Sequence, residues 1–339
     1  MPKISVIIPL YNAENSILET IQSVLHQTFT DFEIIIVNDG SSDRGVNVCR
    51  SIDDPRIRII QQSNRGLAGA RNTGIRSSTG EYLALLDADD LWTPTKLETH
   101  VAFLDQHPEV GISFDYSEFI NADSQPMGLF QKPKQIRNLT PAYILCRNPI
   151  GNGSAPVLRR QLCKDLSYVD PRSPEPCVFD EHLPTRQAED VELWMRVTLT
   201  SPWKIEGIAQ VLTCYRLTQG GLSANVLRQL QALDDVIEKT RTYAPEVIAQ
   251  CERLARAYHL RYIARRMVTL GNGQLAVELI HRSLRSNWRI LLEEPRKTLL
   301  TAIAAYALRD FPLHVYQTLA QFAIAKLSAE SLSSRTSAL

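Results

Sequence analysis

The chain has 339 residues, of which 44% are hydrophobic and 22% charged, ordinary values for a globular protein with a full core. Its 37 Lys/Arg and 37 Asp/Glu balance to a formal net charge of zero, which argues against nucleic acid as a partner. Six scattered cysteines without a C-x-x-C pair argue against a zinc site or a disulfide framework and suit a reducing cytosol.

The first hundred residues alternate short β-branched apolar runs with amphipathic stretches, a pattern typical of parallel strands joined by helices. The apolar runs predict buried strands over residues 4–10, 33–38, 57–61 and 82–87. Helical spacing predicts crossover helices over residues 14–27 and 67–76. We therefore expect an α/β sheet with helices on both faces.

The middle of the chain has a mixed pattern. Strands are predicted over residues 111–120 and 210–216, and a helix over 188–199. The proline-rich stretch 171–184 between them predicts a long loop, and long loops in compact domains tend to be functional. These elements complete a predicted α/β domain over residues 1–225.

From residue 226 to the end, the composition predicts a separate helical domain, 226–339. This part holds 16 Lys/Arg and 10 Asp/Glu, a net charge of +6. Solvated helix faces are the favoured interpretation, and weak association with a membrane surface is the alternative. Because MPKISVIIPLYN lacks signal-peptide features and no uncharged apolar stretch reaches membrane-spanning length, we expect a protein that is cytoplasmic or peripheral at the membrane.

Polar residues follow three of the predicted strands directly. They are Tyr11-Asn12, Asp39 and the run Asp87-Ala88-Asp89-Asp90. In parallel sheets, ligands bind beyond the carboxyl ends of the strands, where all three segments would meet. The sequence therefore predicts a binding site at this edge.

The acidic run suggests a metal site. Carboxylates this close repel one another unless a cation offsets them, and a hard divalent ion with oxygen ligands does so. For Asp87 and Asp89 we favour this function. Asp90 could equally be the N-cap of a helix, because it precedes Leu91-Trp92-Thr93-Pro94.

Five segments occur in a fixed order between residues 4 and 216: SVIIPLYN, VNDGSSD, NRGLAGARNTG, LLDADD and AEDVELWMR. In this order the chain resembles the inverting glycosyltransferases of family 2, which have the GT-A fold. The resemblance does not extend past residue 225. It implies an enzyme that transfers a sugar from a nucleotide-sugar, with UDP expected as the nucleotide, and that uses Mn²⁺ or Mg²⁺.

The resemblance also implies roles for individual residues. Tyr11 would lie against the nucleobase and Asp39 would accept its N3–H, although Asp39 could instead form an Asx-turn. Arg71 would reach toward the base or diphosphate, or could be a solvated helix arginine. Asp89 would be the direct metal ligand, with Asp87 shared between ribose and metal. The full predicted donor site is Pro9, Tyr11, Asn12, Asp39, Gly66, Arg71, Asp87 and Asp89.

Glu189-Asp190 matches the family's catalytic acidic segment, and Asp190 matches its base, which removes the proton of the acceptor hydroxyl. The alternative is that both carboxylates only complement the positive end of a helix. Trp194 and Arg196 fit a W-x-x-R pattern and are candidates for the acceptor site, although a core position for Trp194 is nearly as favoured.

Two absences matter for the interpretation. The Q-x-x-R-W segment of processive family members is missing, so one sugar per encounter is expected, added to a polysaccharide, glycolipid or glycan precursor. No histidine follows Cys214-Tyr215-Arg216, where the family usually has one near the diphosphate. The alternative function is a non-catalytic nucleotide-sugar-binding or adaptor module on the same fold.

Overall fold

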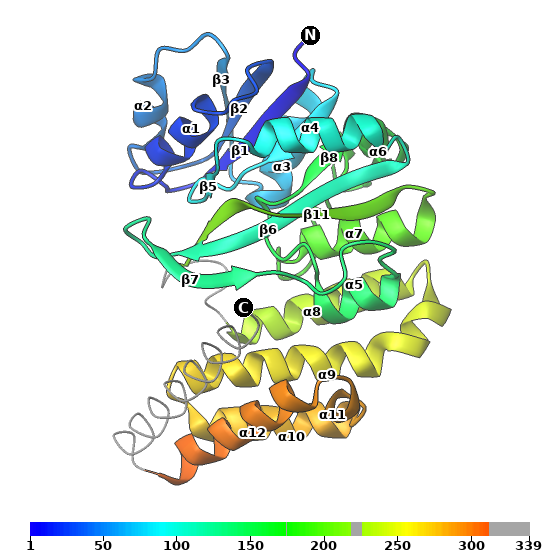
Figure 1. The fold of residues 1–339 in the computed structure, drawn as a ribbon. Helices are drawn as coiled ribbons and strands as arrows, with labels where there is room; N and C mark the ends of the chain where they lie inside the picture. The colour runs from blue at the N-terminus through cyan, green and yellow to red at the C-terminus, as the bar shows by residue number, and fades with distance from the viewer. Residues whose placement is uncertain (174, 218–225, 312–339) are drawn as a thin grey trace, which may run out of the picture. The chain divides into compact units, whose positions relative to one another are not determined.

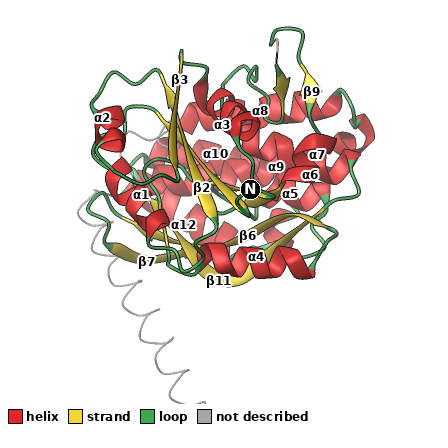
Figure 2. Cartoon of the chain, turned by 90° about the horizontal axis from the view of Figure 1, so that it is seen from above, coloured by secondary structure: helices red, strands yellow, loops and turns green. Residues whose placement is uncertain are grey.

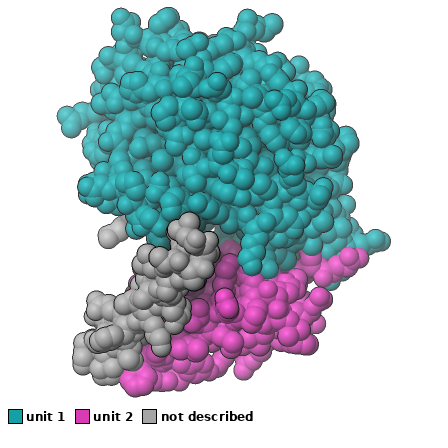
Figure 3. Space-filling model, viewed as in Figure 1, with its two compact units in different colours: residues 1–249 teal, residues 250–339 magenta. Residues whose placement is uncertain are grey.

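The computed structural model describes residues 1–173, 175–217 and 226–311. The chain divides into two compact units, Met1–Ala249 and Gln250–Leu339 (Figure 3). The sequence predicted a domain boundary after residue 225. Residues 218–225 lie outside the described part of the chain, so this boundary stays a prediction.

The main strands of the first unit form one sheet in the order β3-β2-β1-β4-β8-β6-β11-β5, with β7 paired to β6 (Figure 1). Their bounds are β1 (Ile4–Leu10), β2 (Phe32–Asp39), β3 (Ile57–Gln62), β4 (Tyr82–Leu85), β5 (Leu91–Trp92), β6 (Val110–Ile120), β7 (Pro126–Gln131), β8 (Val157–Arg159) and β11 (Lys204–Arg216). The long pairings β1–β2, β2–β3 and β6–β11 are parallel, whereas β8 runs antiparallel to both neighbours. The mixed sheet confirms the predicted α/β fold class.

Helices flank this sheet, as Figure 2 shows in red. They are α1 (Ile17–Leu25), α2 (Gly45–Arg50), α3 (Gly66–Ser77), α4 (Lys96–Gln106), α5 (Pro141–Arg147), α6 (Arg160–Asp165), α7 (Glu189–Thr200) and α8 (Val226–Arg241). The predicted loop 171–184 contains β10 (Pro176–Cys177), which pairs with β9 (Tyr168–Val169). Sequence patterns did not indicate β5, β7, β8 or the helices α4 to α6.

All seven residues of β1 are buried, as its continuous apolar sequence predicts. Helix α3 packs tightly on this strand because Gly74 has no side chain. A Cβ added at Gly74 would lie 2.3 Å from Ile7 Cγ2. The close approach fixes α3, and with it Arg71, against the centre of the sheet.

The later helices are α9 (Pro245–Thr269), α10 (Gly273–Ser286), α11 (Ile290–Glu293) and α12 (Pro295–Asp310). The helical C-terminal region is therefore confirmed, and the break between α9 and α10 falls at the predicted Gly271-Asn272-Gly273. Across the part of the chain that the structure describes, every helix is too short or too polar to span a lipid bilayer.

Candidate active site

A buried arginine connects two of the predicted site segments. Arg71 on α3 is 1% exposed, and its Nη2 donates to Asp87 Oδ1 at 2.8 Å while its Nη1 donates to Glu189 Oε1 at 2.7 Å. The aromatic ring of Phe179 lies 5.5 Å from the guanidinium carbon. Arg71 is thus no solvated helix arginine. It joins the end of β4 to the start of α7.

The predicted base lies beside this ion pair. Glu189 and Asp190 form the first turn of α7, whose N-cap, Ala188, has a positive φ of 60° and provides no side-chain cap. Burial raises the pKa of Glu189 to about 7, although Arg71 acts against the shift. Burial also raises the pKa of Asp190, again opposed by Arg71. Both carboxylates therefore hold a proton more readily than in water.

Asp90 has a structural role that differs from the predicted helix cap. The residues after it form β5 rather than a helix, and α4 begins only at Lys96. The Asp90 carboxylate instead accepts hydrogen bonds from Ser154 Oγ at 2.6 Å and from the backbone N of Arg216 at 2.8 Å. The helix-cap interpretation is wrong because Leu91-Trp92 pairs with β11.

Arg216 and Ser154 fix the acidic run from both sides. Arg216 Nε donates to the backbone oxygen of Asp89 at 2.6 Å, and its Nη2 donates to Glu19 Oε2 at 3.0 Å. Ser154 Oγ accepts from the backbone N of Asp87 at 3.0 Å. The Tyr-Arg segment that the sequence pointed to therefore orders the acidic run.

Asp89 is the carboxylate best placed to bind a cation. In the described residues no side chain donates a hydrogen bond to it. Burial and the charge of Asp87 raise its pKa to about 6, a repulsion that a divalent ion would relieve. Within the same residues no group of three or more His, Cys, Asp or Glu has metal-site geometry. A divalent ion bound here would therefore have Asp89 as its main ligand from the protein, a role that stays a prediction.

Asp39, the predicted contact of the nucleobase, is held by several hydrogen bonds. Its carboxylate accepts from the backbone N of Arg65 and of Gly66, each at 2.8 Å, and from Gln62 Nε2 at 2.6 Å. Asp39 therefore caps the start of α3, where Gly66 has a positive φ of 79°, and it does not form the Asx-turn considered from the sequence. Sequence reasoning missed this cap because 27 residues separate Asp39 from Gly66.

Beside Asp39, the loops after β1 and β2 are tied together. Asn12, with a φ of 49°, accepts from the backbone N of Ser42 at 2.9 Å. Its own backbone N donates to Ser41 Oγ at 3.2 Å. The neighbouring Tyr11 is 55% exposed, so its ring is free to meet a ligand, whereas Pro9 is a buried residue of β1.

The two residues considered for the acceptor site are engaged inside the protein. Trp194 is 0% exposed, the core position that the sequence also allowed. Arg196 pairs with Glu192 at 3.0 Å and donates to the backbone oxygens of Leu166 and Val178. Contact with an acceptor would require both side chains to leave these positions.

Gly153 belongs to the site although no sequence pattern indicated it. A Cβ added there would lie 2.0 Å from Arg71 Nη2 and 2.8 Å from Asp87 Oδ2. Only glycine therefore lets the turn before β8 approach the ion pair. The dipeptide Asn152-Gly153 indicates a turn, but it does not indicate that the turn lies against Arg71 and Asp87.

Comparison with known proteins agrees with this architecture. A family model described as Glycosyl transferase family 2 matches residues 5–167. The Escherichia coli protein WfaP, a UDP-Glc:alpha-D-GlcNAc-diphosphoundecaprenol beta-1,3-glucosyltransferase, is 31% identical over 243 residues, covering 70% of this chain and 86% of WfaP. WfgD, a second E. coli enzyme with the same activity in its name, is 31% identical over 238 residues, which cover 69% and 85% of the two chains.

Solved structures are similar in fold. The mannosyltransferase PcManGT of Pyrobaculum calidifontis, solved with GDP-Man and Mn²⁺, superposes with a TM-score of 0.55 at 20% identity, over 90% of this chain and 86% of PcManGT. TarS of S. aureus gives a TM-score of 0.56 at 19% identity, over 93% of this chain and 54% of TarS. Together with the relatives above, they place the fold in the GT-A class. The chain belongs to glycosyltransferase family 2 and is a glycosyltransferase.

Proposed function

We propose that this enzyme transfers a single sugar, with inversion, from a UDP-linked donor to a hydroxyl of a lipid-linked sugar diphosphate. The observation that carries the proposal is the buried Arg71, which joins Asp87 on the donor side to Glu189 beside the candidate base. The activities that the names of WfaP and WfgD state support the UDP-sugar donor and the diphosphate-lipid acceptor.

In the proposed reaction, Asp190 is the base. Because the backbone N of Val191 donates to Asp190 Oδ1 at 2.7 Å, Oδ2 is the oxygen that takes the acceptor's proton. As the acceptor hydroxyl gives up this proton, its oxygen forms a bond to the anomeric carbon of the donor sugar. The bond between that carbon and the β-phosphate oxygen breaks at the same time, which releases UDP. The raised pKa of Asp190 favours proton acceptance.

The proposed metal ion is Mn²⁺ or Mg²⁺, held by Asp89 with Asp87 beside it. Such an ion neutralises the charge that develops on the leaving diphosphate. Arg71 holds Asp87 in place through their ion pair. Tyr11 and Asp39 are the proposed contacts of the nucleobase.

The test is UDP release from UDP-glucose with an α-GlcNAc-diphospho-alkyl lipid as acceptor, followed by a screen of other nucleotide-sugars. We expect turnover with Mn²⁺ or Mg²⁺ and its loss in chelator. Asp190→Asn should keep its affinity for UDP, measured by calorimetry, and lose turnover by roughly 100-fold or more. Near-normal kcat in Asp190→Asn would show that Asp190 is not the base. Equal UDP affinity with and without chelator would contradict a metal ion in donor binding.

The second unit suggests how the enzyme meets a lipid-linked acceptor. On α12 the buried residues are Thr298, Thr301, Ala305 and Leu308, whereas Leu299, Leu300 and Ile303 are each more than half exposed. The helix thus turns its larger apolar side chains outward, contrary to a solvated helix. Residues 250–311 hold 11 Lys/Arg and 5 Asp/Glu, so the outward apolar face lies on a basic unit. Both features fit an anionic membrane surface.

Co-sedimentation of the full chain with vesicles tests this part of the proposal. Binding to phosphatidylcholine vesicles should increase when phosphatidylglycerol is added, and Leu300→Glu/Ile303→Glu should abolish the increase. Leu270→Glu is the control, because Leu270 is equally exposed but lies outside α12. If neither the anionic lipid nor the double substitution changes the fraction of protein that binds vesicles, a membrane role is contradicted.

A further inference from the structure

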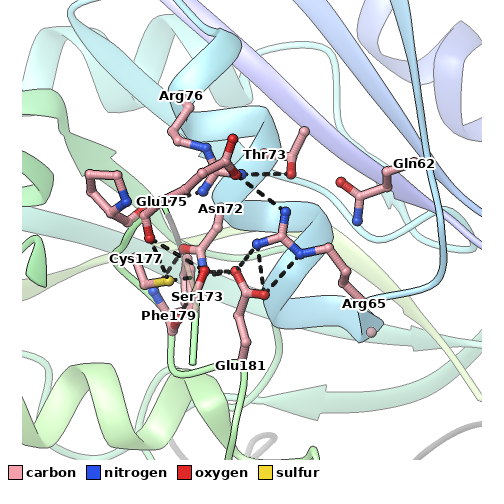
Figure 4. Close-up of polar contacts among 12 residues, drawn as sticks. Gln62, Arg65, Asn72, Thr73, Arg76, Ser173, Glu175, Cys177, Phe179 and Glu181 are labelled. Atoms are coloured by element: carbon pink, nitrogen blue, oxygen red, sulfur yellow. Dashed lines mark hydrogen bonds and ion pairs between the residues drawn. The ribbon is translucent and has the colours of Figure 1, made fainter. Parts of the chain in front are cut away.

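The loop that leads into the candidate base is fastened to α3 by one buried amide. Asn72, the neighbour of Arg71, is 1% exposed. Its Oδ1 accepts from the backbone N of Val178 and of Phe179, each at 2.9 Å, while Nδ2 donates to the Phe179 oxygen at 2.9 Å and to Glu181 Oε1 at 2.8 Å. All four hydrogen-bonding positions of the amide are therefore used, and all on the same loop (Figure 4).

Glu181 extends the connection toward the nucleoside end of the site. Its side chain is 5% exposed, and its carboxylate accepts three hydrogen bonds from Arg65. Nη2 donates to Oε1 at 2.8 Å and to Oε2 at 2.9 Å, and Nε donates to Oε2 at 3.0 Å. The backbone N of the same Arg65 donates to Asp39. We call Asn72, Glu181 and Arg65 the clasp (Figure 4). Through Arg65 the clasp connects Asp39 to Glu181 of the loop.

The loop needs such a fastening because its last residues are strained. Between Glu181 and Glu189 the backbone passes through positive φ at Arg186 (52°) and Ala188 (60°), conformations that non-glycine residues adopt only when their surroundings impose them. Helix α7 begins directly after Ala188 without a side-chain cap. The direction in which Glu189 and Asp190 point therefore depends on where the loop is held.

We propose that Asn72 and Glu181 are positioning residues for the transfer reaction: the clasp holds the loop so that Asp190 meets the acceptor hydroxyl. The proposal rests on the proposed function, in which Asp190 is the base. Two adjacent residues of α3 then position the base. Arg71 binds Glu189 in the first turn of α7, and Asn72 binds the loop before it.

The key variant is Asn72→Asp, which keeps the shape but replaces the donor Nδ2 by an acceptor that faces Glu181 Oε1. Glu181→Gln added to it restores a donor opposite the new carboxylate and removes the like charge, while an oxygen remains for Arg65. Arg76→Met is the matched control. Arg76 lies one turn further along α3 and also binds the loop, at Glu175 and the Pro176 oxygen. Its side chain forms no hydrogen bond or ion pair with a residue of the clasp, and its partner Glu175 keeps a second ion pair, with Arg65 at 3.3 Å, in the variant.

We expect Asn72→Asp to lower kcat roughly 10- to 100-fold, as a misplaced catalytic group does, with UDP affinity unchanged. Asn72→Asp/Glu181→Gln should recover about tenfold of that loss, and Arg76→Met should retain wild-type kcat even if its melting temperature falls. Amide hydrogen exchange of residues 186–191 should be faster in Asn72→Asp than in Arg76→Met. This readout needs no acceptor.

Wild-type kcat in Asn72→Asp with a lowered melting temperature would overturn the proposal, because the clasp would then only stabilise the fold. Unchanged exchange at residues 186–191, or a loss of UDP affinity parallel to kcat, would also overturn it. Asp190→Asn, measured alongside, separates the two proposals. If Asp190→Asn is inactive while Asn72→Asp is fully active, only the positioning role of the clasp is contradicted. If Asp190→Asn stays active, the assignment of Asp190 as the base is contradicted.

Discussion

Arg71 Nη1 and Glu189 Oε1 are 2.7 Å apart although 118 positions separate the two residues in the chain. Both side chains are buried, and the second guanidinium nitrogen binds Asp87. One cation thus holds together carboxylates from the end of β4 and from the start of α7. The stability of this centre and its chemistry therefore depend on the same residue.

Replacing Arg71 by methionine should destabilise the protein strongly. The substitution leaves Asp87 and Glu189 without their cation, and breaking a buried ion pair on one side costs about 3–5 kcal/mol in the free energy of unfolding. Urea denaturation measures the change. Arg76→Met on the same helix, with a partly exposed ion pair, should cost about 1 kcal/mol or less. Similar losses in the two variants would contradict the central role of Arg71.

Glu189 should make the stability depend on pH. Its pKa is about 7 in the folded protein against the ordinary value of 4.5. Between these values the folded state keeps a proton that the unfolded state releases, so stability falls as pH rises through this window. In Glu189→Gln the fall should be shallower, which denaturation curves from about pH 5 to about pH 8 will show. An equally steep fall in the variant would mean that other groups cause it.

Gly153→Ala should disturb the site more than the fold. The new methyl group would overlap Arg71 Nη2 and crowd Asp87, so we expect a loss of about 1–3 kcal/mol together with a marked fall in turnover. Gly128→Ala is the control. The φ of Gly128, 65°, disfavours alanine, but no atom lies within 4 Å of a Cβ added there. Gly128→Ala should lose some stability and keep its turnover. Normal turnover in Gly153→Ala would show that the ion pair adapts.

A second buried ion pair supports the turn that carries Gly153. Lys96 and Asp115 are both 0% exposed, and Lys96 Nζ also donates to the backbone oxygen of Ala155 at 2.9 Å. Lys96→Met should cost about 3 kcal/mol, because it leaves the buried Asp115 without its lysine and with only the contacts to His100, Leu212 and Thr213. Lys96→Met/Asp115→Leu should recover part of this loss in urea denaturation. No recovery would show that the hydrogen bond to Ala155 matters more than the charge pair.

The sequence predicted the strands of the first hundred residues because their β-branched apolar runs act locally. The predicted strand 4–10 coincides with β1, and 33–38 lies within β2. Later elements were harder, since β5 and β8 are short and owe their conformation to pairing with distant strands. The same long-range pairing made the helix-cap interpretation of Asp90 wrong.

Site residues divide in the same way. The acidic run and Glu189-Asp190 were found from ordered motifs, and the structure brings Asp87 and Glu189 together through Arg71. Their roles as metal ligand and base stay predictions. Arg65 and Asn72 lie in the motif NRGLAGARNTG, but the motif did not indicate their contacts with the loop. The contacts of Gly153, Ser154 and Glu181 were not predicted either, because their partners are far away in the sequence.

The long-range bonds around the acidic run have a consequence for folding during synthesis. Asp90 receives its hydrogen bond from Arg216, 126 positions later, and Asp87 lies beside an arginine whose second carboxylate partner is Glu189. A nascent chain that has emerged only as far as Asp90 contains the whole acidic run, but neither Glu189 nor Arg216. Closing such distant contacts is slow. The contacts that hold the acidic run can therefore be completed only after residue 216 has been synthesised.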